Sequence, residues 1–101
     1  MNKQYINELK ADTTSALMIE ENKAEQYRIK ILHRGEQLFY YDKKINKALI
    51  IEIQVRNGSI FKTSINKWDD GVTINEAEKT TITDRLINYF KTFQKIDATI
   101  R

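Results

Sequence analysis

Apolar and polar residues alternate along two stretches in the middle of the chain, residues 27–31 and 48–56. A period of two is typical of a β-strand with one buried face. In the second stretch, four apolar residues point to the same side: Leu49, Ile51, Ile53 and Val55. Between the two stretches, the aromatic-rich residues 38–41 favour a third strand. The pattern therefore predicts a sheet built from neighbouring strands.

Turn chemistry and the remaining apolar residues extend this sheet. Asn57 and Gly58 both tolerate positive φ, so they predict a type I′ hairpin turn. Residues 60–65 should then return antiparallel to 48–56.

Near the start of the chain, the spacing of Tyr5, Ile6 and Leu9 predicts a short helix over 2–10. Residues 15–20 either form a further strand or continue that helix.

The strongest helix signal lies near the end of the chain. Asn75 and Glu78 have the spacing of a capping box, in which each side chain bonds the other residue's backbone N–H. An apolar stripe follows, made of Ile82, Leu86, Tyr89, Phe90 and Phe93. Such a stripe covers one face of a sheet. We therefore predict a helix over about 76–94.

Together these elements predict an α+β fold. An antiparallel sheet of four to five strands is packed by one long C-terminal helix, with a short helix near the N-terminus. The 101 residues make a single domain, 1–101. Within it, 26–65 form the sheet hairpins and 76–94 the helix, and 1–25 are a candidate N-terminal extension.

Composition excludes several classes of protein. The chain has no cysteine, which excludes disulfides and thiolate chemistry. Its longest apolar run, Ala48 to Ile51, is far shorter than a membrane span. No signal peptide is recognisable, so the cytoplasm is the expected location and no membrane is expected. The net charge of +3 is too small to indicate nucleic acid by itself.

Residues that could carry catalysis are few. His33 is the only histidine and follows a strand at a turn, without a signalled acid–base partner. Asp69 and Asp70 resemble a paired-carboxylate site to which Glu76 and Glu78 could add oxygen ligands. However, Asp-Gly is also a common turn, and we favour that interpretation. We therefore predict no enzyme, no metal and no cofactor, and expect His33 to lie far from the acidic loop.

Charge is distributed unevenly. Residues 26–68 contain nine basic and three acidic residues, whereas 69–78 contain four acidic residues and no basic one. If the helix covers one sheet face, the polar side of the strands is open and basic. That face could bind single-stranded nucleic acid by stacking and phosphate contacts, bind an acidic protein, or simply be solvated. The candidate partner-binding residues are Arg28, Lys30, Tyr41, Arg56, Lys62, Asp69 and Asp70.

Residues 64–82 resemble part of a group of small bacterial domains. Ser64-Ile65-Asn66-Lys67-Trp68 matches a strand end reading Ser-Ile-x-x-Trp, followed by the acidic turn to Gly71 and by Ile74-Asn75-Glu76-Ala77-Glu78 at the helix start. Asn75 stands where serine is usual, and 1–25 lie outside the pattern. Some of these domains are classed as immunity proteins of polymorphic toxin systems. The resemblance implies that Trp68 closes the sheet under the helix.

The sequence therefore leaves two main hypotheses of function. The first is a non-enzymatic interaction protein, an immunity protein that binds and inhibits a cognate bacterial toxin. The alternative is a module that binds single-stranded nucleic acid through the basic sheet face. Both a monomer and a homodimer are compatible with the sequence, because an exposed sheet edge can pair with a second copy.

Overall fold

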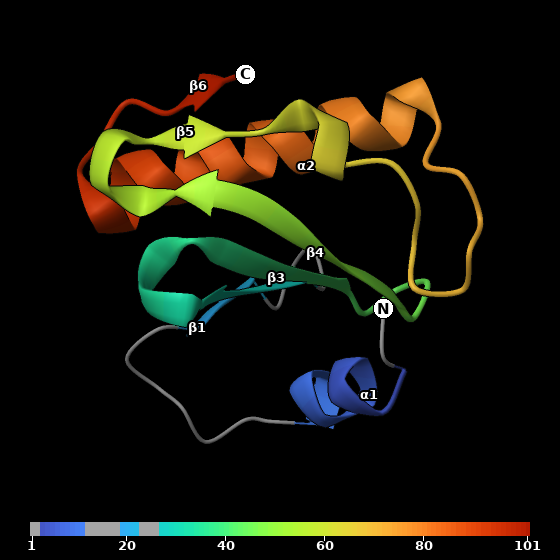
Figure 1. Ribbon diagram of the computed structural model, residues 1–101. Helices are drawn as coiled ribbons and strands as arrows, with labels where there is room; N and C mark the ends of the chain where they lie inside the picture. Colours follow the sequence, from blue (N-terminus) through green and yellow to red (C-terminus); the bar gives the residue numbers. More distant parts are fainter. Residues whose placement is uncertain (1–2, 12–18, 23–26) are drawn as a thin grey trace.

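The computed structural model describes residues 3–11, 19–22 and 27–101, which form an α+β fold (Figure 1). Helix α1 (Lys3–Ala11) and helix α2 (Glu76–Tyr89) lie on opposite faces of one sheet. The predicted fold class, the short N-terminal helix and the C-terminal helix are thereby confirmed. Because each helix buries an apolar stripe on the sheet, the described part of the chain has three layers.

The predicted antiparallel sheet of four to five strands is confirmed only in part, because the sheet is mixed although mostly antiparallel. Its strands are β1 (Ile19–Asn22), β2 (Tyr27–Leu32), β3 (Gln37–Asp42), β4 (Lys47–Gln54), β5 (Ser59–Ile60) and β6 (Thr99–Ile100). They lie in the order of the chain, and only the pair β5–β6 is parallel. The two-residue β6 was not predicted, since so short a strand has no alternation to recognise. The predicted element at 15–20 lies mostly outside the described residues, with β1 beginning at Ile19.

Side chains alternate between two cores. The larger core lies between the sheet and α2, and Tyr40, Ile51, Leu86 and Phe90 are among its most buried members. The smaller core lies between the sheet and α1 and contains the five residues Ile6, Leu9, Leu32, Phe39 and Ala48. Adjacent residues of β3, such as Phe39 and Tyr40, belong to different cores because neighbouring strand side chains point to opposite faces.

The prediction of an open, basic sheet face is wrong. Helix α1 covers that face, and its Ile6 and Leu9 pack on it. Arg28, expected to be exposed, is only 5% exposed. Its Nη1 atom donates a hydrogen bond to the carbonyl of Lys10 at 3.1 Å. The last carbonyls of a helix have no partner within the helix, so the buried guanidinium meets an acceptor that needs a donor.

The predicted type I′ turn is also wrong. The strand β4 ends at Gln54 and is followed by a 3₁₀ turn, η3 (Val55–Asn57), so four residues separate the paired Gln54 and Ser59. Only Gly58, at φ +70°, has the left-handed conformation. Asn57 uses its side chain instead, accepting from the N–H of Ser59. The predicted strand 60–65 is interrupted after Ile60 by a second 3₁₀ turn, η4 (Lys62–Ser64).

Helix α2 begins with the predicted capping box. The side-chain oxygen of Asn75 accepts from the N–H of Glu78 at 2.8 Å, and Glu78 accepts from the N–H of Asn75 at 3.0 Å. The helix continues as a π-turn, η5 (Phe90–Gln94), and ends at Lys95 with φ +59°. The predicted span 76–94 is therefore confirmed. Phe93 departs from the buried stripe, because 52% of it is exposed.

Candidate functional site

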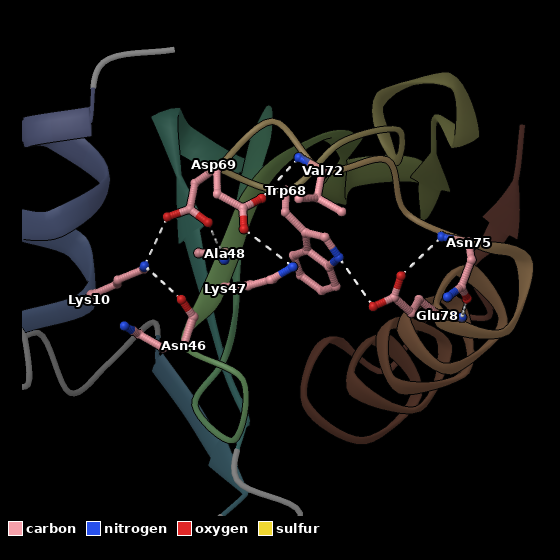
Figure 2. A network of polar contacts seen from close by, with 10 residues as sticks. Lys10, Asn46, Lys47, Ala48, Trp68, Asp69, Val72, Asn75 and Glu78 are labelled. Carbon is pink, nitrogen blue, oxygen red and sulfur yellow. Dashed lines mark hydrogen bonds and ion pairs between the residues drawn. The ribbon is translucent and has the colours of Figure 1, made fainter.

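The turn from Trp68 to Gly71 is bonded to the sheet and to both helices (Figure 2). One carboxylate oxygen of Asp69 accepts from the N–H of Ala48 in β4 at 3.0 Å, and the N–H of Asp69 donates to the carbonyl of Ala48 at 2.8 Å. The other oxygen forms an ion pair with Lys10 of α1 at 2.8 Å. Asp69 is therefore a structural link between β4 and α1.

Three candidate partner-binding residues meet at Lys10, which the sequence did not single out. The Lys10 ammonium pairs with Asp69, donates to the carbonyl of Asn46 at 3.2 Å and lies 5.5 Å from the ring centre of Tyr41. The backbone carbonyl of Lys10 accepts from Arg28. Because these groups bond one another, they hold α1 on the sheet.

Asp70 has a different environment from Asp69. It is exposed, forms an ion pair with Lys47 at 3.3 Å and accepts from the N–H of Val72 at 3.0 Å. The hydrogen bond from Val72, together with Lys47, lowers the pKa of Asp70. The two aspartates thus face different partners. Within the described residues, no group of three or more histidine, cysteine or acidic side chains could hold a metal ion.

The remaining candidates are dispersed. Lys30 is half-buried on the face that α1 covers, whereas Arg56 and Lys62 are exposed in the separate turns η3 and η4. His33 follows β2 at the sheet end where Leu32, Gln37 and Glu52 pair. Asp69 bonds Ala48, four residues before Glu52 on β4. A strand rises about 3.3 Å per residue, so the expected separation of His33 from the acidic loop is confirmed.

A cavity of about 290 Å³ opens beside the Trp68 turn, between β3 and the start of α2. It is lined by Tyr40, Asp42, Ile45, Trp68, Asn75, Ala77, Glu78, Thr81 and Ile82. Tyr40 and Trp68 form its inner wall, with ring centres 6.3 Å apart, and both side chains are almost completely buried. A cavity with an apolar lining and a few convergent polar groups is the usual form of a binding site. We refer to it as the β3–α2 cavity.

Two carboxylates give the β3–α2 cavity its charge. Glu78 accepts from the indole N–H of Trp68 at 3.3 Å while its other oxygen completes the capping box. Asp42 lies at the end of β3, and one of its oxygens accepts from the N–H of Lys44. Its other oxygen lies 3.9 Å from Nη1 of Arg85. The lining therefore combines aromatic rings with carboxylates that keep acceptor capacity.

Arg85 orders the rings behind the cavity. Its guanidinium lies 4.3 Å from the ring centre of Tyr27 and donates to the hydroxyl of Tyr40 at 2.6 Å. Tyr27 and Tyr40 are themselves stacked, with ring centres 6.0 Å apart. Burial raises the pKa of the Tyr40 hydroxyl to about 12, although the hydrogen bond from Arg85 opposes this shift. Tyr40 therefore stays protonated at neutral pH.

The raised pKa of Tyr40 predicts a loss of stability in alkali. The folded protein holds this proton up to pH about 12, whereas a model tyrosine releases it near pH 10.0. The contribution of protonated Tyr40 to the free energy of unfolding is thus complete below pH 10, and it is lost as the pH rises from 10 toward 12. One pKa unit corresponds to about 1.4 kcal/mol, so the full effect of the shift is about 2.8 kcal/mol, of which about 2 kcal/mol should be lost between pH 9 and pH 11.5.

Urea unfolding of the wild type and Tyr40→Phe at pH 9 and pH 11.5 measures this effect. The variant lacks the hydrogen bond from Arg85 at both pH values, so that loss is a constant offset. We expect the wild type to lose more stability between the two pH values than Tyr40→Phe. An equal loss in both proteins would contradict the assignment to Tyr40.

The β3–α2 cavity was not predicted, although some of its residues carried a signal. The family resemblance drew attention to Trp68, which is 4% exposed and has its ring centre 6.3 Å from that of Tyr40. Asp42 and Thr81 carried no comparable signal. Their proximity depends on how α2 crosses the sheet, and no local pattern encodes that crossing.

Comparisons with known proteins leave the chain without an assigned relative. No family model matches it, and no curated protein or solved structure matches it either. The resemblance of residues 64–82 to immunity domains therefore stays a prediction, as do the absence of catalysis and the cytoplasmic location. In the part of the chain that the structure describes, no helix is long and apolar enough to cross a membrane.

Proposed function

We propose that this protein is a non-enzymatic interaction domain that binds a partner protein through the β3–α2 cavity. The observation that supports this most strongly is the combination of Tyr40 and Trp68 with the carboxylates of Asp42 and Glu78 in one cavity. The two carboxylates are suited to a lysine or arginine side chain, because a cation forms charge-assisted hydrogen bonds with them. The buried rings of Tyr40 and Trp68 give the site a rigid apolar wall. The partner would insert such a basic side chain there.

The rim of the cavity supports a protein as the occupant. Ile45 lines it and is 44% exposed, so it offers an apolar contact to a partner beside the two carboxylates. Interfaces combine such apolar contacts with charged pairs, and Trp and Tyr are enriched among the residues that contribute most binding energy. Because Trp68 and Tyr40 are already fixed by packing, binding would require little reordering of the site.

The resemblance of residues 64–82 supports a more specific proposal, in which the partner is a cognate bacterial toxin. The matched segment includes Trp68 and Glu78, which belong to the cavity. In this proposal the protein neutralises the toxin by covering its functional surface. A toxin-like reading frame beside the gene would favour the proposal, and co-expression with that toxin should protect cells.

Substitutions at two adjacent threonines test the site. Thr81 lines the cavity, whereas Thr80 does not, yet both are exposed and both donate their hydroxyl to the carbonyl four residues earlier in α2. Thr81→Arg places a cation in the cavity and should weaken partner binding at least tenfold, because it repels and displaces the partner's basic side chain. Thr80→Arg adds the same charge outside the cavity and should bind as the wild type does.

The measurement is a quantitative pull-down from the native cell with wild type, Thr81→Arg and Thr80→Arg, followed by titration of the captured partner. Loss of the same partner with both variants would mean that charge, and not the cavity, controls binding. Retention by Thr81→Arg would remove the cavity from the interface. The basic side chains of the captured partner are then replaced one by one. If no replacement weakens binding, the proposed contact is excluded.

A further inference from the structure

A second cavity, of about 320 Å³, lies at the other end of β3. Its lining comes from two turns, and the residues are Arg34, Gly35, Glu36, Gln54, Val55 and Arg56. The first three belong to the turn between β2 and β3, the last three to the end of β4 and η3. We call it the two-arginine cavity. The β3–α2 cavity contains Asp42, the last residue of β3, whereas Glu36 of the two-arginine cavity precedes the first residue of that strand.

The two turns are held together by backbone contacts. The N–H of Ile53 donates to the carbonyl of Glu36 at 3.1 Å. Gly35 approaches Val55 so closely that a Cβ atom on Gly35 would lie 3.0 Å from the Cβ of Val55. The walls of the cavity are therefore fixed relative to each other, which lowers the ordering cost of binding a ligand.

The backbone at the first turn adopts an uncommon conformation. His33, Arg34 and Gly35 have φ values of +48°, +58° and +94°. Left-handed conformations of residues other than glycine cost of order 1 kcal/mol each and occur preferentially at functional sites. Here they place Arg34 at a cavity that also contains Arg56, a residue 22 positions later in the chain.

The charge of the two-arginine cavity favours an anion. Both arginines are exposed, and the lining residues include two arginines against one acidic residue, Glu36. Arginine binds phosphate oxygens with two parallel hydrogen bonds, and such charge-assisted bonds are stronger than neutral ones. A dianionic phosphate group has enough oxygens for both guanidiniums, and its net attraction to two cations and one carboxylate is about twice that of a singly charged carboxylate.

We infer that the two-arginine cavity binds the phosphate group of a small phosphate monoester or of inorganic phosphate, held between Arg34 and Arg56. This inference is independent of the proposed protein partner, because the residues of the two cavities do not overlap. The glutamine double variant R34Q/R56Q removes both cations but keeps side chains of similar reach. The matched control K62Q/K67Q removes the same charge from two exposed lysines outside the cavity.

The test is a titration of the ¹⁵N-labelled protein, followed by amide chemical shifts at constant ionic strength. Inorganic phosphate and a nucleoside monophosphate are added separately, with chloride as the reference anion. We expect saturating shifts confined to residues 33–36 and 54–57, with tighter binding of the monoester if the cavity also contacts its organic part. R34Q/R56Q should weaken the binding at least tenfold, whereas K62Q/K67Q and Thr81→Arg should not change it.

Shifts that do not saturate, or that chloride reproduces, would overturn the inference. Equal weakening by R34Q/R56Q and K62Q/K67Q would do the same, because it would indicate general charge attraction. The amide spectrum of each variant shows whether it is folded. A folded R56Q single variant provides a second measurement if Arg34→Gln disturbs the strained turn.

Discussion

Replacing Gly58 by alanine should lower the free energy of unfolding by about 2 to 5 kcal/mol. Two physical effects add. Gly58 has φ +70°, a conformation that an alanine adopts only with strain. A Cβ atom at this position would also lie 2.6 Å from Cγ2 of Ile96 and 3.3 Å from the carbonyl oxygen of Asp97. The second contact is with backbone, so relief requires the C-terminal segment to move.

That movement would also disturb β6, because the N–H of Thr99 donates to the carbonyl of Gly58 at 2.8 Å. Gly71→Ala is the matched control. Gly71 has φ +86°, but nothing lies within 4 Å of the added Cβ atom. Gly71→Ala should therefore lower the free energy of unfolding by about 1 kcal/mol, from backbone strain alone. Urea unfolding measures both variants, and equal stabilities would show that the contact with Ile96 relaxes freely.

Replacing Phe90 by alanine should lower the free energy of unfolding by about 3 to 5 kcal/mol. Phe90 is fully buried in the larger core and meets Tyr89 edge to face, with ring centres 5.8 Å apart. Removal of the ring loses its transfer free energy and leaves a cavity that the surrounding strands cannot fill. The loss should appear in the urea midpoint without a change in slope.

Phe93→Ala is the control for Phe90→Ala, since both residues belong to η5 and undergo the same chemical change. Phe93 is 52% exposed, although it stacks on Tyr89 with ring centres 5.6 Å apart. Replacing Phe93 by alanine should lower the free energy of unfolding by about 1 kcal/mol or less. A comparable loss for both variants would mean that the end of α2 is packed differently from the structure described above.

Local chemistry explains which elements could be predicted from the sequence. The capping box of Asn75 and Glu78 depends on residues three positions apart, and the alternation in 48–56 repeats every second residue. Neither requires knowledge of the rest of the fold. A turn at Gly58 was predicted for the same reason, but the predicted turn type was wrong. The side chain of Asn57 satisfies the N–H of Ser59 in a conformation that the two-residue turn does not allow.

Arrangements between distant segments could not be predicted. Arg28 is on the polar side of its strand, and that pattern alone indicates solvent. It is buried because α1 ends above it and presents the carbonyl of Lys10. The sequence predicted a helix from Tyr5, Ile6 and Leu9 but contained no information about the sheet face on which it packs. For the same reason, neither cavity was recognisable before β3 was placed beside its neighbours.

The position of Asp69 has a consequence for how the protein responds to its surroundings. The same carboxylate joins β4 and α1, and its neighbour in the chain is Trp68, a wall of the β3–α2 cavity. Only a ligand that displaced Trp68 would change the free energy with which Lys10 is held, and linkage would then make the effect reciprocal. Attachment of α1 on one face of the sheet would in that case report on occupancy of the other face.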